Sequence, residues 1–599
     1  MNINVVNTVF LFAATAMIFF MQAGFAMLET GFTRAKNTGN IIMKNVIDFA
    51  IGSVAFTLVG FGLMYGNGLP VIGDIAGIAS TKNYGTAMLP EGVPFFLFVI
   101  FQTVFAGTAA TIVSGGMAER TKFSAYCIIS LALSLFVYPI EARWIWSSQG
   151  WLHILGFHDF SGGTAVHLCG GLTALLGAWF LGPRIGKYDK EGKPRAIQGH
   201  NIAMAALGLF VLWFGWFGFT GGMVQNLTAD SAEILGKVLV NMNLSAATCV
   251  CTVVLTTWIK YGKSDVPLSL NGILMGLVVI TPAADTVSAG SAMLMAILAG
   301  IVMVFGVEFV DEVLKIDDPV GAFMIHGIGG AMGTLLVGLF SDGTGTDGRK
   351  GLLLGGGLHV LGIQLLGVIA VAAWVGGVMY LAFKAVKKSN GLRVEPEDEL
   401  IGLDESEHAL GSAYPNFTLL PDATEYFYIG DKVKQIELTS RDDSSGEEKS
   451  RREPASVEET VSVREENNKG LKLTQVTVIC NQAKLEALKE GLNQIGITGI
   501  TITNVMGCGV QKGRNKYFRG IPVGMQLLPK VRVDVVVSKV SVARIIDVTR
   551  KILYTGNIGD GKIFVYDVEN VIKVRTGEEG YAALQYSDVI WDEKNPDKS

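Results

Sequence analysis

Long apolar segments dominate the chain as far as about residue 385, and charged, soluble-type sequence follows them. A helix needs roughly 20 mainly apolar residues to cross a bilayer, and eleven stretches approach or exceed that length. The pattern therefore predicts a polytopic α-helical membrane domain followed by a separate extramembrane part. The expected spans are 5–28, 46–65, 94–117, 123–142, 162–182, 201–222, 235–258, 268–283, 288–307, 320–340 and 353–384.

The basic residues give the expected orientation. An odd number of spans places the two ends of the chain on opposite sides of the membrane. The segments that follow odd-numbered spans hold about 17 Lys and Arg residues, whereas the opposite side holds about 5. Basic residues favour cytoplasmic loops. We therefore expect the N-terminus outside and the C-terminal extension in the cytoplasm.

Two histidines lie in apolar spans within the same local sequence pattern. Asp159 precedes His167 by eight residues, Asp318 precedes His326 by eight residues, and Gly-Gly follows each histidine at three and four residues. An ionisable side chain at a membrane helix centre costs roughly 2.5–3.5 kcal/mol on insertion scales. Either histidine alone could be a satisfied core residue, but the repetition favours function. Neutral imidazole donates and accepts hydrogen bonds, so the pair suits a small hydrogen-bonding solute or a proton relay.

The histidine patterns fall in the fifth and tenth expected spans. Each closes a half of five spans, and an odd number of spans inverts the second half relative to the first. We therefore predict eleven transmembrane helices as an inverted 5+5 repeat plus one, an architecture with a substrate pathway near the midplane. The Gly-Gly pairs are also ordinary helix-packing residues, and packing is compatible with lining a pathway.

Composition narrows the class of protein. Half of the 599 residues are hydrophobic, 17% are charged and the mean hydropathy is +0.42, as expected for a membrane protein. The net charge of −5 averages two different parts of the chain, and a basic nucleic-acid footprint is absent. The six cysteines show no metal-ligand spacing. Neither part contains a nucleophile–base arrangement, so we expect no enzyme and no nucleic-acid partner.

Aromatic residues recur within the third span, at Phe101 and Phe105, within the sixth span, from Trp213 to Phe219, and just after the fourth span, at Trp144 and Trp146. Trp at a membrane boundary is usually a belt residue. Aromatic faces also hold ammonium-type cations without a counter-charge, at roughly 0.5–2 kcal/mol each. Because few acidic residues are expected within the spans, a neutral or transiently neutral solute is preferred.

The chain up to about residue 415 resembles the ammonium transporter family along its whole length. The resemblance implies a homotrimer in lipid, in a prokaryotic cytoplasmic (inner) membrane, with one pore per subunit. It also implies recruitment of ammonium at Trp146, Phe105 and Asp159, a gate of Phe105 and Phe219, and a pore pair of His167 and His326. The stretches that carry it are Gly31–Asn40, Met43–Asn45, Ala118–Arg120, Asp159–His167, Gly215–Phe219, Asp317–His326 and Glu399–His408.

The free-energy cost of removing water from a cation is consistent with this arrangement. Stripping a cation of water is expensive, so we expect deprotonation before the constriction, with ammonia and the proton crossing separately. One position departs from the family, which usually has Ser four residues after the second gate Phe, where this chain has Met223. A hydroxyl acceptor for ammonium is then missing, and Thr220 or a backbone carbonyl is the candidate substitute.

The expected domain limits are 1–390 for the membrane domain, 391–430 for a cytoplasmic C-terminal region, 431–470 for a charged linker, 471–580 for a regulatory domain and 581–599 for a tail. Alternation and helical periodicity in 471–580 predict strand, helix, strand, strand, helix, strand, the α+β ferredoxin-like order. The segment 507–530 between the middle strands is too long for a hairpin, so we expect it to be functional.

Residues 471–580 resemble the PII signal-transduction proteins through Gly496–Thr501, Gly507–Gly513, Leu528–Lys530, Gly556–Asp567 and Val574–Glu579. The resemblance implies that Gln511 holds Mg²⁺ with 2-oxoglutarate and that Lys530 helps to bind 2-oxoglutarate. It also implies ATP or ADP between trimer subunits, at Thr501, Gly559, Asp560, Gly561, Lys562, Lys573 and Arg575.

Three positions depart from the PII pattern. Val510 replaces an Arg that contacts phosphate, and Val523 replaces a Tyr that is modified in many PII proteins. Lys573 stands in for an Arg and loses its bidentate geometry.

Together the resemblances imply an ammonium transporter whose 507–530 loop plugs the cytoplasmic pore exit according to bound nucleotide and 2-oxoglutarate. Tethering raises the effective concentration of the regulator, so no separate PII protein is needed. The alternative is an ammonium sensor that signals through the PII domain with little transport. A passive gas channel is a third reading, which Trp146 disfavours because a neutral gas needs no cation–π face.

Overall fold

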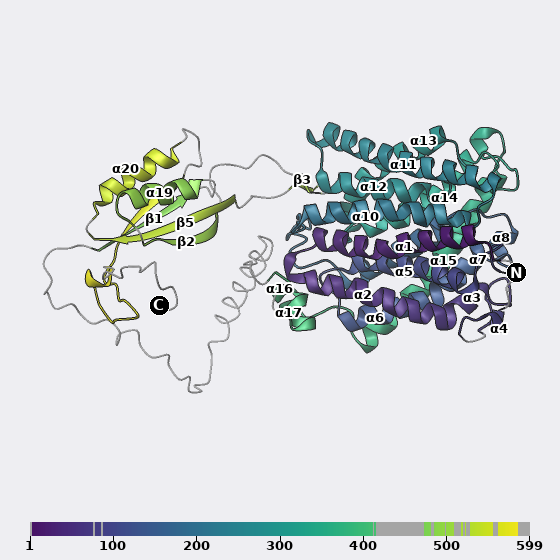
Figure 1. Ribbon diagram of the computed structural model, residues 1–599, viewed down its shortest axis with the longest axis horizontal. Helices are drawn as coiled ribbons and strands as arrows, with labels where there is room; N and C mark the ends of the chain where they lie inside the picture. Colours follow the sequence, from purple (N-terminus) through teal and green to yellow (C-terminus); the bar gives the residue numbers. More distant parts are fainter. Residues whose placement is uncertain are drawn as a thin grey trace. The chain divides into compact units, whose positions relative to one another are not determined.

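The computed structural model describes residues 3–75, 78–84, 88–410, 413–414, 473–480, 484–497, 499–507, 517–518, 521–522, 528–538, 540–554 and 561–584. These residues form two compact units. The first is a bundle of long helices within residues 1–435, and the second is a small sheet covered by helices (Figure 1). The expected linker 431–470 lies outside the described residues, so the domain limits there stay a prediction.

Ten helices in the described residues are long and apolar enough to cross a membrane, and a shorter apolar helix, α12 (Val266–Ile280), occupies the place of the expected eighth span. The polytopic helical membrane fold is thereby confirmed in outline. The long helices are α1 (Val5–Phe32), Ala35–Tyr65 with α2 (Thr38–Ala55) and α3 (Phe61–Tyr65), α5 (Phe95–Met117), Phe123–Ile154 with α6 (Phe123–Ala132), α7 (Tyr138–Trp146) and α8 (Trp151–Ile154), Gly163–Leu181 with α9 (Cys169–Leu181), Ile202–Val224 with α10 (Ile202–Gly221), α11 (Ala229–Tyr261), Ala289–Leu314 with α13 (Ala289–Glu308), Phe323–Phe340 with α14 (Gly329–Phe340), and α15 (His359–Ser389).

The second span begins earlier than hydropathy indicates. The expected start was residue 46, but α2 begins at Thr38, so Lys44 lies inside this helix rather than in a connection. The Lys44 side chain is fully buried, and its Nζ pairs with Glu29 Oε1 of α1 at 3.2 Å. Hydropathy scores each polar residue as if it met lipid alone, so a pair of opposite charges shared by two helices is invisible to it.

Glycines bring several helices into backbone contact. A Cβ added at Gly24 of α1 would lie 2.9 Å from the carbonyl oxygen of Gly208 in α10. A Cβ at Gly171 would lie 2.1 Å from Gly327 N, and one at Gly330 would lie 2.2 Å from Gly163 O. Both Gly-Gly pairs therefore act in packing, because a glycine without a side chain lets the backbones of the two histidine-bearing segments lie in direct contact.

Two short helices after α15 cover one end of the bundle. They are α16 (Pro396–Ile401) and α17 (Leu403–His408). Lys36 Nζ donates to the carbonyl oxygens of Glu399 and Leu400 at 2.9 and 2.7 Å. Leu403 N donates to Asn37 Oδ1 at 2.9 Å. The α1–α2 loop and the C-terminal region thus hold each other in place.

A buried ionic cluster lies at the same end. Glu119 Oε1 accepts from Arg34 Nε at 3.0 Å, and Glu119 Oε2 pairs with Arg184. Arg184 also grips Asp317 through Nε and Nη2, at 2.8 Å each. Burial alone would raise the pKa of the Glu119 carboxyl, but Arg34 and Arg184 outweigh it and hold that pKa well below its usual range. The cluster, which we call the Glu119 cluster (Arg34, Glu119, Arg184 and Asp317), ties four loops together.

The second unit has the expected order of elements. Its sheet runs β2-β5-β1-β6 with every neighbouring pair antiparallel, which is the ferredoxin-like order. Inward-facing valines of β1 and β5 pack against Leu488 and Leu492 of one helix and Ile545 of the other. The elements are β1 (Thr474–Cys480), α19 (Leu485–Gln494), β2 (Thr501–Gly507), β5 (Leu528–Val537), α20 (Val542–Leu553) and β6 (Lys562–Asp567). The chain between β2 and β5 also contains a two-stranded ribbon of β3 (Tyr517–Phe518) and β4 (Ile521–Pro522), which is not part of this sheet.

Candidate functional site

Both pore-candidate histidines lie in a π-helical turn at the start of a span. His167 belongs to the turn η4 (Gly163–Leu168), which continues into α9. His326 belongs to the turn η7 (Phe323–Ile328), which continues into α14. Both side chains are buried. Isolated π-turns inside α-helices recur at functional sites, and here the same local geometry occurs twice.

The repeated aspartates cap these turns. The Asp159 carboxylate accepts four backbone N–H groups, from residues 162 to 165, at 2.7–2.9 Å. Asp318 accepts from Gly321 N at 2.9 Å and Phe323 N at 2.8 Å. The constant spacing of Asp before His therefore has a structural cause, since each carboxylate satisfies the free N–H groups that begin a helix.

The two imidazoles face each other. Nδ1 of His326 lies 3.2 Å from Nδ1 of His167, and the ring centroids are 5.1 Å apart at 25°. A hydrogen bond between two Nδ1 atoms requires one neutral ring to carry its proton on Nδ1 and the other on Nε2. The pair is therefore built to exchange hydrogen bonds, and with a small solute it can donate from one ring and accept at the other.

A column of aromatic rings continues from the histidines. Phe219 lies 5.6 Å from the His167 ring and stacks on Phe105 at 4.4 Å and 26°. Phe105 meets the Trp146 ring edge-on at 5.8 Å and 88°. Trp146 is fixed because its Nε1 donates to the carbonyl oxygen of Asp159 at 2.8 Å. The structure thus brings the sequence-selected residues together in one row, while the role of each stays a prediction.

Trp216 belongs to this row, although the sequence did not single it out as a site residue. Its fully buried ring stacks on His167 at 5.4 Å and 13°, and its Nε1 donates to Thr281 Oγ1 at 3.1 Å. The signal was present in the sequence: Trp216 precedes the gate candidate Phe219 by three residues, so both share one face of α10.

Polar groups lie close in sequence to Met223, the position where the family usually has Ser. Met223 is half-buried at the end of α10. Thr220, the expected substitute, is fully buried and its Oγ1 accepts from Ser161 Oγ at 3.3 Å. Ser161 Oγ also lies 2.9 Å from the carbonyl oxygen of Thr281, and its single proton serves one of these two acceptors at a time. A hydroxyl pair therefore adjoins the gate residue Phe219, but its use in substrate binding stays a prediction.

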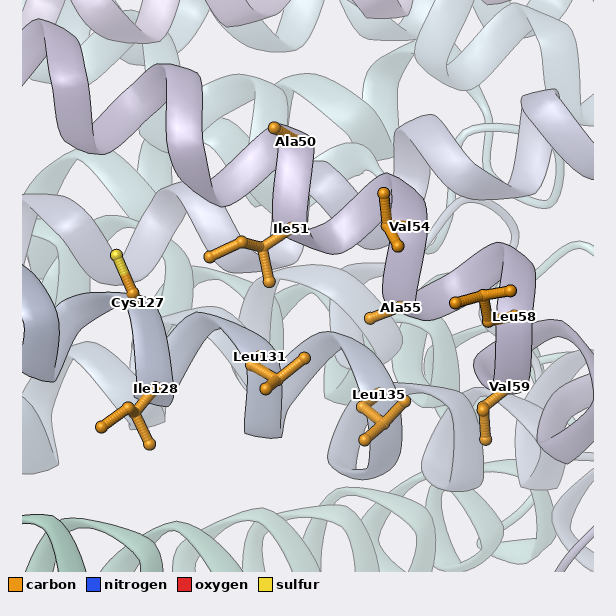
Figure 2. A pocket seen from close by; sticks show the side chains of 10 residues that line it. All are labelled: Ala50, Ile51, Val54, Ala55, Leu58, Val59, Cys127, Ile128, Leu131 and Leu135. Atoms are coloured by element: carbon orange, nitrogen blue, oxygen red, sulfur yellow. The ribbon is translucent and has the colours of Figure 1, made fainter.

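Figure 2 shows the large apolar groove between α2 and α6. Its volume is about 550 Å³, and its lining is aliphatic apart from the Cys127 thiol. A groove with this lining cannot recognise a small cation or its conjugate base, and neither histidine nor gate phenylalanine lines it. The buried row, and not this groove, is therefore the candidate functional site of the helical unit.

The nucleotide candidates of the second unit are divided between the edges of its sheet. Thr501 lies on β2 and Lys562 on β6, which are the two edge strands. With neighbouring strands about 4.8 Å apart, three strand steps separate them, so a single copy does not bring them together. Gly561 has φ +134°, and an added Cβ would lie 2.4 Å from Ile479 O, so glycine is required there.

The other ligand candidates have simpler outcomes. Lys573 Nζ pairs with Glu578 Oε2 at 3.1 Å, Arg575 is exposed, and Lys530 is half-buried on β5. Gln511, Gly559 and Asp560 lie outside the described residues, as do the departures Val510 and Val523. Among the described residues no group of three or more His, Cys, Asp or Glu side chains is placed to hold a metal ion.

Comparison with known proteins covers both units. Residues 9–414 match the Ammonium Transporter Family, and residues 473–578 match the Nitrogen regulatory protein P-II. Ammonium transporter Amt2 of Archaeoglobus fulgidus is 43% identical over 418 residues, which cover 67% of this chain and 86% of that protein. Ammonium transporter 3 of Dictyostelium discoideum is 35% identical over 418 residues, 68% of this chain and 94% of that protein.

Solved structures give the same match. A sensor Amt protein is 37% identical with a TM-score of 0.63, covering 67% of this chain and 98% of its own. Mep2 from Candida albicans is 26% identical with a TM-score of 0.60, covering 70% of this chain and 94% of its own.

Proposed function

Because this chain belongs to the ammonium transporter family and carries a P-II domain, we propose that it moves ammonium across a membrane under the control of that domain. One observation carries the proposal: the row Trp146, Phe105, Phe219, His167 and His326, in which each ring contacts the next. The row offers aromatic faces to a cation, then an apolar constriction, then paired hydrogen-bonding groups.

Recruitment takes place at Trp146 and Phe105. Aromatic faces attract an ammonium ion while it loses water, and the two rings stand nearly perpendicular at 88°. Asp159 supports this step by fixing Trp146 through its carbonyl group and by placing a buried negative charge near the site.

Conduction follows deprotonation. The stacked rings of Phe105 and Phe219 exclude a hydrated cation, because desolvating a charge in an apolar constriction is far more costly than passing neutral ammonia. Below the gate, His167 and His326 donate to and accept from ammonia, and they carry the released proton separately.

The proposed architecture has eleven spans as an inverted 5+5 repeat plus α15, with α12 as the short eighth span. The paired histidine segments support the repeat, since each is a capped π-turn followed by a helix, and their backbones meet at Gly171 and Gly327. We further propose a homotrimer in a prokaryotic cytoplasmic (inner) membrane, with the N-terminus outside and the P-II domain in the cytoplasm.

Regulation acts through adenine nucleotide. We propose that ATP or ADP binds between copies of the P-II domain, with 2-oxoglutarate and Mg²⁺ at Gln511 and Lys530. The placement of Thr501 and Lys562 on opposite sheet edges supports a site shared by two subunits, because one copy separates them. The ligand state then decides whether the 507–530 loop closes the cytoplasmic exit, and no separate P-II protein is needed.

Truncation tests this regulation. In proteoliposomes loaded with ATP, ADP or 2-oxoglutarate, we expect ammonium flux through the full chain to depend on the ligand. A variant that ends at residue 430 should show one flux under all conditions. The full-length variant Lys562→Met should lose the response, whereas Lys551→Met, at an exposed pair with Asp547 on α20, should keep it. Ligand-dependent flux in the truncated variant would refute regulation in cis.

Sensing is the second candidate function, and the similarity to a sensor Amt protein favours it. Electrical recording of proteoliposomes separates the two functions. A transporter gives a saturable current when ammonium is added, whereas saturable ammonium binding without current identifies a sensor. We expect the current, because the row of rings leads past the gate to the histidine pair and does not end at the recruitment site.

A further inference from the structure

A small cavity lies beside His326, and neither gate phenylalanine lines it. Its volume is about 30 Å³, and its polar lining comes from His326, Glu29 and Thr111. The rest of the lining is apolar and includes Phe25, Leu28 and Ile325. A water molecule needs about 10–15 Å³ of such volume and two or more polar partners. The cavity therefore has room for one or two waters between His326 and Glu29.

Glu29 is a carboxylate held inside the helix bundle. Its Oε1 accepts from Lys44 Nζ at 3.2 Å and from Ser114 Oγ at 2.8 Å, and its Oε2 accepts from Asn45 Nδ2 at 2.8 Å. Glu29 is only 5% exposed to solvent. A buried carboxylate is sustained only by such compensation, and here a lysine and two neutral donors provide it. Glu29 is thus a compensated, buried carboxylate that lines the same cavity as His326.

His326 has one ring nitrogen that does not face His167. Since Nδ1 of His326 faces His167, Nε2 is its remaining hydrogen-bonding nitrogen. The Phe25 ring lies 6.4 Å from the His326 ring, and Glu29 follows Phe25 by four residues on the same face of α1. The helix that contacts His326 therefore also presents the carboxylate.

We propose that Glu29 accepts the proton that the histidine pair releases, an inference that rests on the proposed transport function. His326 gives its Nε2 proton to a cavity water, and that water gives one of its own protons to the Glu29 carboxylate. The imidazolium becomes neutral imidazole, the carboxylate becomes a carboxylic acid, and Lys44 keeps its charge beside it. The proton thereby leaves the row of rings sideways towards α1 and α2, and its path separates from that of ammonia.

Counting protons and ammonia separately tests this proposal. In proteoliposomes, the ammonium-evoked current reports the proton, and stopped-flow alkalinisation of the lumen under an ammonia gradient reports ammonia. For Glu29→Gln, which keeps the size of the side chain, we expect at least a tenfold loss of current with ammonia passage within twofold of wild type. Glu29→Asp should recover part of the current, because it restores a carboxylate.

The variant Glu29→Gln with Lys44→Met guards against misfolding, since it removes both charges of the pair together. It should show the same selective loss of current. Equal loss of current and ammonia passage in both variants would overturn the proposal in favour of a structural role, and so would a wild-type current in either. Absence of current in the wild-type chain would instead refute the transport function itself.

Discussion

Replacing His167 and His326 together with alanine is expected to lower the ammonium-evoked current about 100-fold or more. Positioned proton-transfer groups contribute typically 10²–10⁴-fold to a rate, and this change removes both. The Nδ1–Nδ1 contact of 3.2 Å also makes each ring the partner of the other. Each single replacement should therefore already cause most of the loss, because groups that act as a unit are not additive.

The matched control is His153→Ala, which changes an exposed histidine on α8. It should keep the wild-type current. All variants need equal insertion and the same elution profile, since the buried histidines also fill space. A double variant that retains more than half of the current would show that the pair serves packing alone.

Glu119→Ala is expected to lower the free energy of unfolding of the helical unit by about 3–5 kcal/mol, the range for breaking a buried ion pair from one side. The substitution leaves Arg34 and Arg184 with less compensation where both are buried. Denaturant unfolding in detergent measures the loss. Glu308→Gln is the control, because its pair with Lys260 is partly exposed and should be worth less than about 1 kcal/mol.

Acid should act on the same cluster. The carboxyl of Glu119 has a folded-state pKa well below its usual range, because Arg34 and Arg184 outweigh the effect of burial. Its contribution is then complete at neutral pH and is lost as the pH falls below the unfolded value of about 4.3. Stability that falls instead between pH 8 and 6 would contradict this assignment.

Hydropathy and recurring local patterns were sufficient for the main architecture. The spans and the paired histidine segments follow from features that each residue carries in its own stretch of chain, such as an apolar run or a fixed Asp-to-His spacing. The row of rings joins distant segments, and only the resemblance to a known family led us to expect it. The order of strands and helices along the second unit follows in the same way from alternation and helical periodicity, and this order is the one typical of a ferredoxin-like sheet. Apart from the row of rings, each of these features depends on neighbouring residues in the chain, so a sequence pattern is enough to predict it.

Features that depend on contacts between two distant segments could not be predicted from the sequence pattern. The apolar pattern leaves Lys44 in a loop, whereas it lies inside α2, because its partner Glu29 is on another helix. The π-turns at both histidines are absent from the periodicity, because a single wide turn shifts a helix by one residue only. Trp216 gains its role from stacking on His167, a contact across 49 positions of the sequence.

The contacts of the Glu119 cluster and of the C-terminal helices can form only after the later partner of each contact has been synthesised. Arg34 is synthesised before its partner Glu119, and Arg184 before its partner Asp317. Lys36 is synthesised long before Glu399 and Leu400, whose carbonyl groups it contacts. At a synthesis rate of about 5–20 residues per second, Lys36 precedes its partners by roughly 20–70 s. The α1–α2 loop is therefore held by the C-terminal helices only after that interval.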